Sequence, residues 1–200
     1  SQGMGARRLL RLPLFWIAVL LMICAGASEL AMAQWASAYA ESALGLSKAV
    51  GDLAGPCLFA AAMGVSRTIY GKYGSRLDLM RFMLGSGFLC LLCYLAAALS
   101  NAPAAGLAGC MLCGFSVGIM WPGAISICSK RIPAGGTAMF ALLAMAGDLG
   151  GTLGPSLVGG ITQSANDDLR WGMLGGCIFP FVLIICLFVL RRKGVYREED

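Results

Sequence analysis

The strongest constraint on this chain is a series of six apolar stretches, each about as long as a membrane-spanning helix. A helix needs about 20 mainly apolar residues to cross the hydrocarbon core of a bilayer. The 200-residue sequence is 58% hydrophobic and 12% charged, whereas soluble domains are about one quarter charged. The stretches cover residues 12–39, 47–70, 78–99, 103–129, 137–162 and 171–190. The sequence therefore predicts an all-α polytopic membrane protein with residues 1–200 in a single six-helix bundle.

The first stretch has a second interpretation as a secretory signal peptide. RRLLR precedes it, and AGA or AMA within it resembles a cleavage site. The apolar pattern continues past both sites, which favours a transmembrane helix. The sequence begins with SQGM rather than with methionine, which is typical of a processed or excised segment or of a fusion scar.

The distribution of Lys and Arg predicts the orientation of the helices. Thirteen of the 15 basic residues fall on the side of the two termini, and only Lys48 and Arg170 fall on the other. Loops rich in Lys and Arg stay in the cytoplasm. We therefore expect a multi-pass protein of the plasma (inner) membrane with both termini cytoplasmic, residues 1–11 forming a basic lead-in and residues 191–200 a tail.

Composition also excludes several kinds of site. The net charge of +5 comes from short basic clusters between apolar stretches, so no basic face exists to follow a nucleic-acid backbone. The sequence has no histidine, and its nine cysteines all lie within apolar stretches, two pairs of them spaced as CLLC and CMLC. A metal or redox pair needs polar or electropositive surroundings. We expect the cysteines to be small apolar residues at helix interfaces, with no metal and no cofactor.

An acidic residue inside the fifth stretch is the clearest functional signal. A charged carboxylate at the centre of a transmembrane helix costs about 2.5–3.5 kcal/mol. Gly151 and Thr152 follow Asp148 by three and four residues, and Pro155 and Gly159 continue the same helical face. We expect another helix or a cavity to approach this face of small residues closely, so that Asp148 points into the protein. Asp148 then lines a polar path, or it makes a structural hydrogen bond between helices.

The first and fourth stretches carry further polar and aromatic side chains. They lie in SELAMAQWASAYAE and in GFSVGIMWPG, where a proline adds backbone irregularity. The aromatic residues also suit the membrane interface. The third and sixth stretches hold no ionisable residue in their interiors and are expected to face lipid. The expected cavity-lining residues are Glu29, Gln34, Trp35, Tyr39, Ser116, Trp121 and Asp148, with Asp148 and Glu29 as candidates for ion coupling.

Taken in order, these features resemble the carboxyl-terminal half of a major facilitator superfamily transporter, near the fucose-permease-like sugar:proton symporters. Glu29, Trp35 and Tyr39 in the first stretch resemble that group's seventh helix. GVSRTIYGKYGSR (64–76) resembles the second copy of the superfamily's loop signature, with Ser66 where a glycine is usual. GIMWPGAISICSKRIP is similar to the tenth helix, and GTAMFALLAMAGDLGGTLGPSLVGGI to the eleventh.

The resemblance implies two inverted three-helix repeats that form half of a twelve-helix fold, with the first helix of each repeat lining a cavity. It implies a secondary active transporter that moves a small polar solute, such as a sugar, by alternating access coupled to a proton or Na⁺. The expected partners are the lipid bilayer, the solute and an amino-terminal six-helix half. In the fucose-permease-like group the principal proton-carrying acids belong to that other half, so Glu29 and Asp148 either couple or only bind and gate. Arg67, Lys72 and Arg76 form a cytoplasmic gate, or they only set the topology.

Three alternatives remain at this stage. The chain could belong to a multidrug or other organic-solute exporter of the same superfamily. It could be a non-transporting six-helix subunit, which predicts that the first and fourth spans pack tightly and leave no groove. An intramembrane aspartyl enzyme would need Asp148 to meet Asp52, but Asp52 lies near the outer end of its span. We therefore expect no enzymatic activity.

Overall fold

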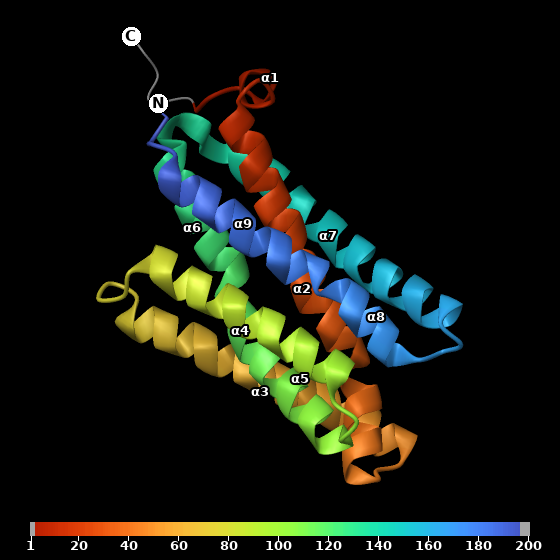
Figure 1. Ribbon diagram of the computed structural model, residues 1–200. Helices are drawn as coiled ribbons and strands as arrows, with labels where there is room; N and C mark the ends of the chain where they lie inside the picture. Colours follow the sequence, from red (N-terminus) through yellow and green to blue (C-terminus); the bar gives the residue numbers. More distant parts are fainter. Residues whose placement is uncertain (1–2, 197–200) are drawn as a thin grey trace.

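The computed structural model describes residues 3–196, apart from the side chains of residues 39 and 42–44 (Figure 1). Every regular element in this part of the chain is helical. The elements are α1 (Ala6–Leu9), α2 (Pro13–Leu44), α3 (Lys48–Tyr73), α4 (Leu79–Leu99), α5 (Pro103–Val117), α6 (Met120–Arg131), the 3₁₀ turn η1 (Pro133–Gly135), α7 (Gly136–Ser164), α8 (Leu169–Gly176) and α9 (Ile178–Arg192).

The described residues contain six helical stretches that are long and apolar enough to cross a membrane. The prediction of an all-α, six-span membrane fold is thus confirmed. Helices α2, α3, α4 and α7 each form one span, whereas the fourth span is divided into α5 and α6, and the sixth into α8 and α9. Both interruptions fall inside stretches that the sequence predicted as single helices.

Short-range signals in the sequence explain where the helices begin. The side chains of Ser47, Asp78 and Asp168 each accept a hydrogen bond from a backbone N–H in the first turn of α3, α4 and α8, which satisfies donors that a helix start leaves free. Pro13 and Pro103 occupy the first turn of α2 and α5, where the missing N–H of proline costs no helical bond.

The two described ends of the chain lie at the same end of the bundle as the turns after α3 and α6 (Figure 1). Hydrogen bonds join three of these segments: Met4 N donates to Ala134 O at 2.6 Å, and Tyr196 N donates to Arg131 O at 2.8 Å. The Arg131 guanidinium also donates to Lys193 O at 2.7 Å. This arrangement is what an even number of spans requires.

Helix α2 is the central element, in contact with α3, α5, α6, α7 and α9. Its closest approach is to α7, where glycines let the two backbones nearly touch. A methyl group on Gly150 would overlap the carbonyl oxygen of Ile23, and one on Gly154 would lie 2.6 Å from that of Ala27. In a bilayer, helices associate by this kind of close packing because lipid tails are as apolar as the side chains.

Small residues occupy two adjacent faces of α7, about 100° apart. Gly147, Gly150 and Gly154 are buried against α2, while Asp148 and Thr152 are exposed. The contact with α2 uses the first of these faces, and what meets the Asp148 face stays a prediction. Sequence spacing alone does not say which of the two faces packs against α2. The closest backbone contact between α2 and α7 decides it.

The exposed surface is not distributed evenly among the spans. Only 22% of the most apolar section of α3 and 28% of that of α7 is buried, whereas the other four spans are buried by half or more. The third and sixth spans, expected to be the outer ones, are therefore better covered within the chain than α3 and α7. Helices α3 and α7 each present a broad face that nothing in the described chain covers.

The cysteines of the two C-x-x-C pairs lie in the interface between α4 and α5. Cys90, Cys93, Cys110 and Cys113 are buried, with the sulfur atoms of Cys90 and Cys113 3.8 Å apart. The Cys110 thiol contacts the carbonyl oxygen of Met32 at 3.8 Å. Their burial among apolar side chains agrees with the interpretation as small interface residues.

Gly150→Ala tests the α2–α7 crossing. We expect it to lower the free energy of unfolding by about 1–3 kcal/mol, the usual cost of overpacking, because the new methyl group has to displace the backbone of α2. The measurement is denaturant unfolding in detergent micelles. Gly160→Ala is the matched control, because a methyl group there meets no atom within 4 Å; a loss of stability equal to that of Gly150→Ala would contradict the assignment.

At the opposite end of the bundle, Arg170 ties two turns together. It donates to both carboxylate oxygens of Asp168 at 3.1 and 3.0 Å and to Asn101 Oδ1 at 2.7 Å. The hydrogen bonds from the Arg170 side chain, and then its backbone N–H, lower the pKa of Asp168. A carboxylate with a depressed folded pKa adds stability above its unfolded pKa, and this contribution is lost as the pH falls through the folded value.

Arg170→Gln is expected to raise the pKa of Asp168 toward its ordinary value, because the side-chain donors disappear while the backbone donor stays. A ¹³C-carboxyl NMR titration measures this shift directly. Arg81→Gln is the matched control, since Arg81 pairs with Asp78 at 3.4 Å in a different turn. An unchanged pKa of Asp168 in Arg170→Gln would show that the capping backbone bond alone sets it.

Candidate functional site

The fourth span is interrupted where a proline removes one helical hydrogen bond. In a regular helix the N–H of residue 122 would donate to the carbonyl of residue 118, but Pro122 has no N–H. Helix α5 ends at Val117 and α6 begins at Met120. The carbonyl oxygen of Gly118 is therefore left without its helical donor, near the middle of a membrane span.

A side chain from α3 supplies the missing donor. Arg67 Nε donates to Gly118 O at 3.0 Å. Close packing makes this contact possible: a methyl group on Gly118 would lie 2.8 Å from Ser66 Cβ, and one on Gly114 would lie 2.5 Å from Phe59 O. The two glycines, four residues apart, thus bring the backbone of α5 against α3 at the level of Arg67.

Glu29 is the acid predicted in the first span. Its side chain lies on the central helix α2 and is half-buried. It does not form an ion pair within 4 Å with Arg67 among the described residues. The contact at the break is therefore one between α3 and the fourth span.

The three basic residues expected at one cytoplasmic gate occupy different surroundings. Arg67 points to the break in the fourth span. Lys72 and Arg76 are exposed at the end of α3, with the Lys72 ammonium 5.4 Å from the centre of the Tyr73 ring. Arg67 is thus bound at the break, and the assignment of the three residues to a cytoplasmic gate stays a prediction.

The polar and aromatic residues after Glu29 are distributed over several environments. Gln34 is exposed, and Trp35 is half-buried. The indole N–H of Trp35 is shielded from solvent and has no acceptor in the part of the chain that the structure describes. The side chain of Tyr39 lies outside the described residues. Gln34 is therefore available to a ligand or to a second bundle, whereas the Trp35 N–H is buried without an acceptor among the described residues.

The two expected lining residues of the fourth span pack inside the bundle. Trp121 is half-buried, and a methyl group on Gly147 would lie 2.6 Å from its six-membered ring. Ser116 is fully buried, and its hydroxyl donates to Cys113 O at 2.7 Å within its own helix. Ser116 is therefore corrected from a lining residue to a packed one, because the span turns this side toward its neighbours.

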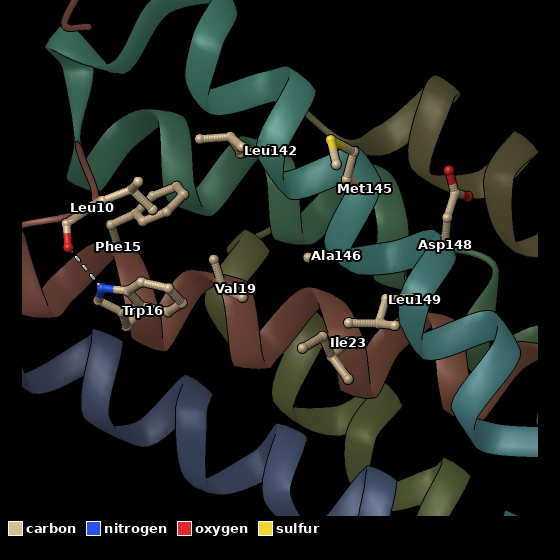
Figure 2. A pocket seen from close by; sticks show the side chains of 10 residues that line it. All are labelled: Leu10, Phe15, Trp16, Val19, Ile23, Leu142, Met145, Ala146, Asp148 and Leu149. Atoms are coloured by element: carbon tan, nitrogen blue, oxygen red, sulfur yellow. Dashed lines mark hydrogen bonds between the residues drawn. The ribbon is translucent and has the colours of Figure 1, made fainter. Parts of the chain in front are cut away.

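Asp148 lies at one end of an open groove of about 520 Å³ between α2 and α7. Figure 2 shows its carboxylate directed away from the aromatic end of the groove, where Trp16 Nε1 donates to Leu10 O at 2.9 Å. Asp148 is ionisable, and the other residues that line this groove are apolar. The lining residues are Leu10, Phe15, Trp16, Val19, Ile23, Leu142, Met145, Ala146, Asp148 and Leu149.

Asp148 also begins a polar stripe on the exposed face of α7. Thr152 and Ser156 follow at intervals of four residues, and all three are exposed. The Thr152 hydroxyl donates to Asp148 O at 3.3 Å, and the Ser156 hydroxyl donates to Thr152 O at 2.7 Å. This stripe runs along the membrane-spanning part of α7 without a partner in the described chain.

Sequence reasoning did not find the contact between Arg67 and Gly118. The signal that could have found it is the position of Pro122, four residues after Gly118, which marks the carbonyl that loses its donor. No comparable signal identifies the buried hydroxyl of Ser66, which has no hydrogen-bond partner among the described residues. It lies beside Gly118 only because α3 and α5 pack together.

Comparison with known proteins gives a family and a fold. Residues 3–155 match the family model of the Major Facilitator Superfamily. No curated protein matches the sequence.

Several solved transporters have a similar fold. The E. coli fucose:proton symporter FucP aligns with a TM-score of 0.79 and 17% identity, over 94% of this chain and 45% of FucP. FucP in the outward conformation gives the same score and identity, over 44% of its length. The peptide transporter POT in complex with alafosfalin aligns with a TM-score of 0.77 and 21% identity, over 91% of this chain and 40% of POT. The chain therefore spans less than half the length of these transporters.

Pro122→Ala tests the cause of the break. Alanine restores an N–H that can donate to Gly118 O, so we expect α5 and α6 to join and Arg67 to lose its acceptor. Amide hydrogen exchange at residues 119–121 and at residue 123 should become slower, because these groups become part of a continuous helix. Pro103→Ala is the control, since the first turn of α5 loses no bond to proline. Unchanged exchange near Gly118 would assign the break to packing rather than to Pro122.

Proposed function

The chain belongs to the Major Facilitator Superfamily, a family of transporters and not of enzymes, and we propose that it is the carboxyl-terminal half of a secondary active transporter. It works by alternating access, together with an amino-terminal six-helix half that rocks against it. The substrate is a small polar solute, a sugar, and a proton moves with it.

The observation that carries this proposal is the exposed polar stripe of Asp148, Thr152 and Ser156 on α7. A charged residue facing lipid at mid-span costs about 2.5–3.5 kcal/mol, and intramembrane acids normally face protein or a water-filled cavity. Helices α3 and α7 are also the least covered spans. A second bundle against these two faces would cover the apolar surface and leave the acid in a water-accessible path.

The choice of a sugar and a proton rests on chemistry and on likeness. The exposed amide of Gln34 is an oriented polar group of the kind that fixes a small polar ligand. The fold is similar to that of a fucose:proton symporter. Asp148 and Glu29 are the carboxylates that can load and release a proton within the membrane, with Na⁺ as the alternative coupling ion.

A second candidate is the export of an amphiphilic organic solute. The apolar, partly aromatic lining of the groove between α2 and α7 favours it, because such a solute buries its apolar part against hydrocarbon side chains.

The proposed location is the plasma membrane, and the proposed orientation has both termini in the cytoplasm. Thirteen of the 15 basic residues support it through the positive-inside rule. The shared location of the described termini and of the turns after α3 and α6 is consistent with it (Figure 1).

The test is counterflow in proteoliposomes that contain this half together with its amino-terminal half. We expect exchange of a labelled sugar, and Asp148→Asn should abolish uptake driven by a proton gradient while binding is retained. An amide keeps the size and polarity of Asp148 but cannot take up and release a proton.

Asp52→Asn is the matched control, because Asp52 is an exposed acid near the beginning of α3. Uptake by this variant should be unchanged. If the protein exchanges amphiphilic drugs or dipeptides but no sugar, the proposed substrate class is wrong. Gradient-driven uptake that survives Asp148→Asn would reduce Asp148 to a structural residue.

A further inference from the structure

The helical turns before α2 have one face that combines positive charge with an apolar side chain. Backbone hydrogen bonds continue the turns of α1 as far as Leu12, whose N–H donates to Leu9 O at 2.9 Å. Residues three and four positions apart share one face of a helix, so Arg7, Leu10 and Arg11 lie on the same side. All three side chains are exposed, whereas Leu9 is turned away from this face and is fully buried.

The two arginines of this face are available to an anion. Together with Arg8 they line an open pocket of about 430 Å³. Neither Arg7 nor Arg11 makes a side-chain hydrogen bond or an ion pair with a residue in 3–196, and Arg8 is not needed for the site. Guanidinium groups bind phosphate strongly, often through two parallel N–H···O bonds. The pocket therefore suits a phosphate group.

The open groove between α2 and α7 begins at the leucine of the same face. Leu10 is one of the residues that line the groove, and its carbonyl oxygen accepts the hydrogen bond from Trp16 Nε1 at 2.9 Å. Figure 2 shows Leu10 and Trp16 at one end of the groove and Asp148 at the other. Leu10 thus joins the basic pocket to the apolar end of the groove.

The groove has the size and the lining of a site for one acyl chain. Its volume is about 520 Å³, and its lining residues other than Asp148 are apolar. Along α2 it runs from Phe15 to Ile23, which is about 12 Å at the rise of an α-helix. Half of the hydrocarbon core of a bilayer is about 15 Å thick. An acyl chain that enters at Leu10 therefore reaches nearly to the middle of the membrane.

We propose that this chain binds one anionic phospholipid in the leaflet next to its termini. The lipid phosphate lies between Arg7 and Arg11, and one acyl chain lies in the groove against Phe15, Trp16 and Val19. The negative surface potential of anionic lipids acts at the cytoplasmic leaflet, which is the side proposed for both termini. The site goes beyond the proposed function, since neither arginine belongs to the proposed path of the proton.

Quenching of Trp16 fluorescence by brominated lipids tests the site, because bromine quenches an indole only at close range. The chain is reconstituted into phosphatidylcholine vesicles with Trp35, Trp121 and Trp171 replaced by Phe. A minor fraction of the lipid carries bromine in the upper part of its acyl chains and is either phosphatidylglycerol or phosphatidylcholine. The ratio of the two apparent affinities measures the preference for the anionic headgroup.

We expect the parent chain to prefer brominated phosphatidylglycerol by about 5- to 25-fold, because each basic residue near an anionic lipid contributes a factor of about five. Arg7→Gln and Arg11→Gln should each lower the preference about fivefold, and the double variant should abolish it. Arg76→Gln is the matched control and keeps the preference. It removes the same charge from an exposed arginine beyond the end of α3.

Four results would overturn the proposal. The first is equal quenching by the two lipids in the parent chain, or a preference that survives in the double variant. The second is an equal loss of preference in Arg76→Gln, which would assign it to general surface charge. The third is relief of quenching by glycerol 3-phosphate added in solution, which would indicate a site for a free phosphate. The fourth is no quenching by either lipid, which would mean that protein covers the groove.

None of these results bears on sugar exchange, which the counterflow experiment decides. Failure of this inference and failure of the proposed function are therefore distinguishable.

Discussion

The hydrogen bond that Pro122 cannot make determines how the centre of this bundle is arranged. A carbonyl without a donor is costly inside a membrane, since no water is present to satisfy it. Here Arg67 of α3 supplies the donor to Gly118. The contact gives a reason why an arginine is accepted within a span, and the glycines of this part of α5 allow α3 to come close enough for it.

A second constraint is that the membrane provides little hydrophobic force between helices. The central helix α2 is instead held by backbone contact, with Gly150 and Gly154 of α7 against Ile23 and Ala27. Because α7 commits its glycine face to α2, the neighbouring face with Asp148 turns outward. The same packing that stabilises the six-helix unit therefore leaves a polar stripe and two poorly covered spans that nothing in the described chain contacts.

Much of the fold could be predicted because it depends on local properties. Length and apolarity alone identify the six spans, and capping residues such as Ser47 and Asp78 mark where helices begin. The candidate site was harder to predict. Ser116 is packed inside the bundle and does not line a cavity, because helical spacing defines a face but does not say which neighbour it meets.

The sequence by itself determined the membrane class, the number of spans and the positions of the acids, since these follow from composition and from the length of a helix that crosses a bilayer. Only the tertiary structure decided that Arg67 contacts Gly118, and that Asp148 is exposed within the described chain. Those outcomes depend on which backbones approach within contact distance. That distance is a property of helix pairs, and no single helix encodes it.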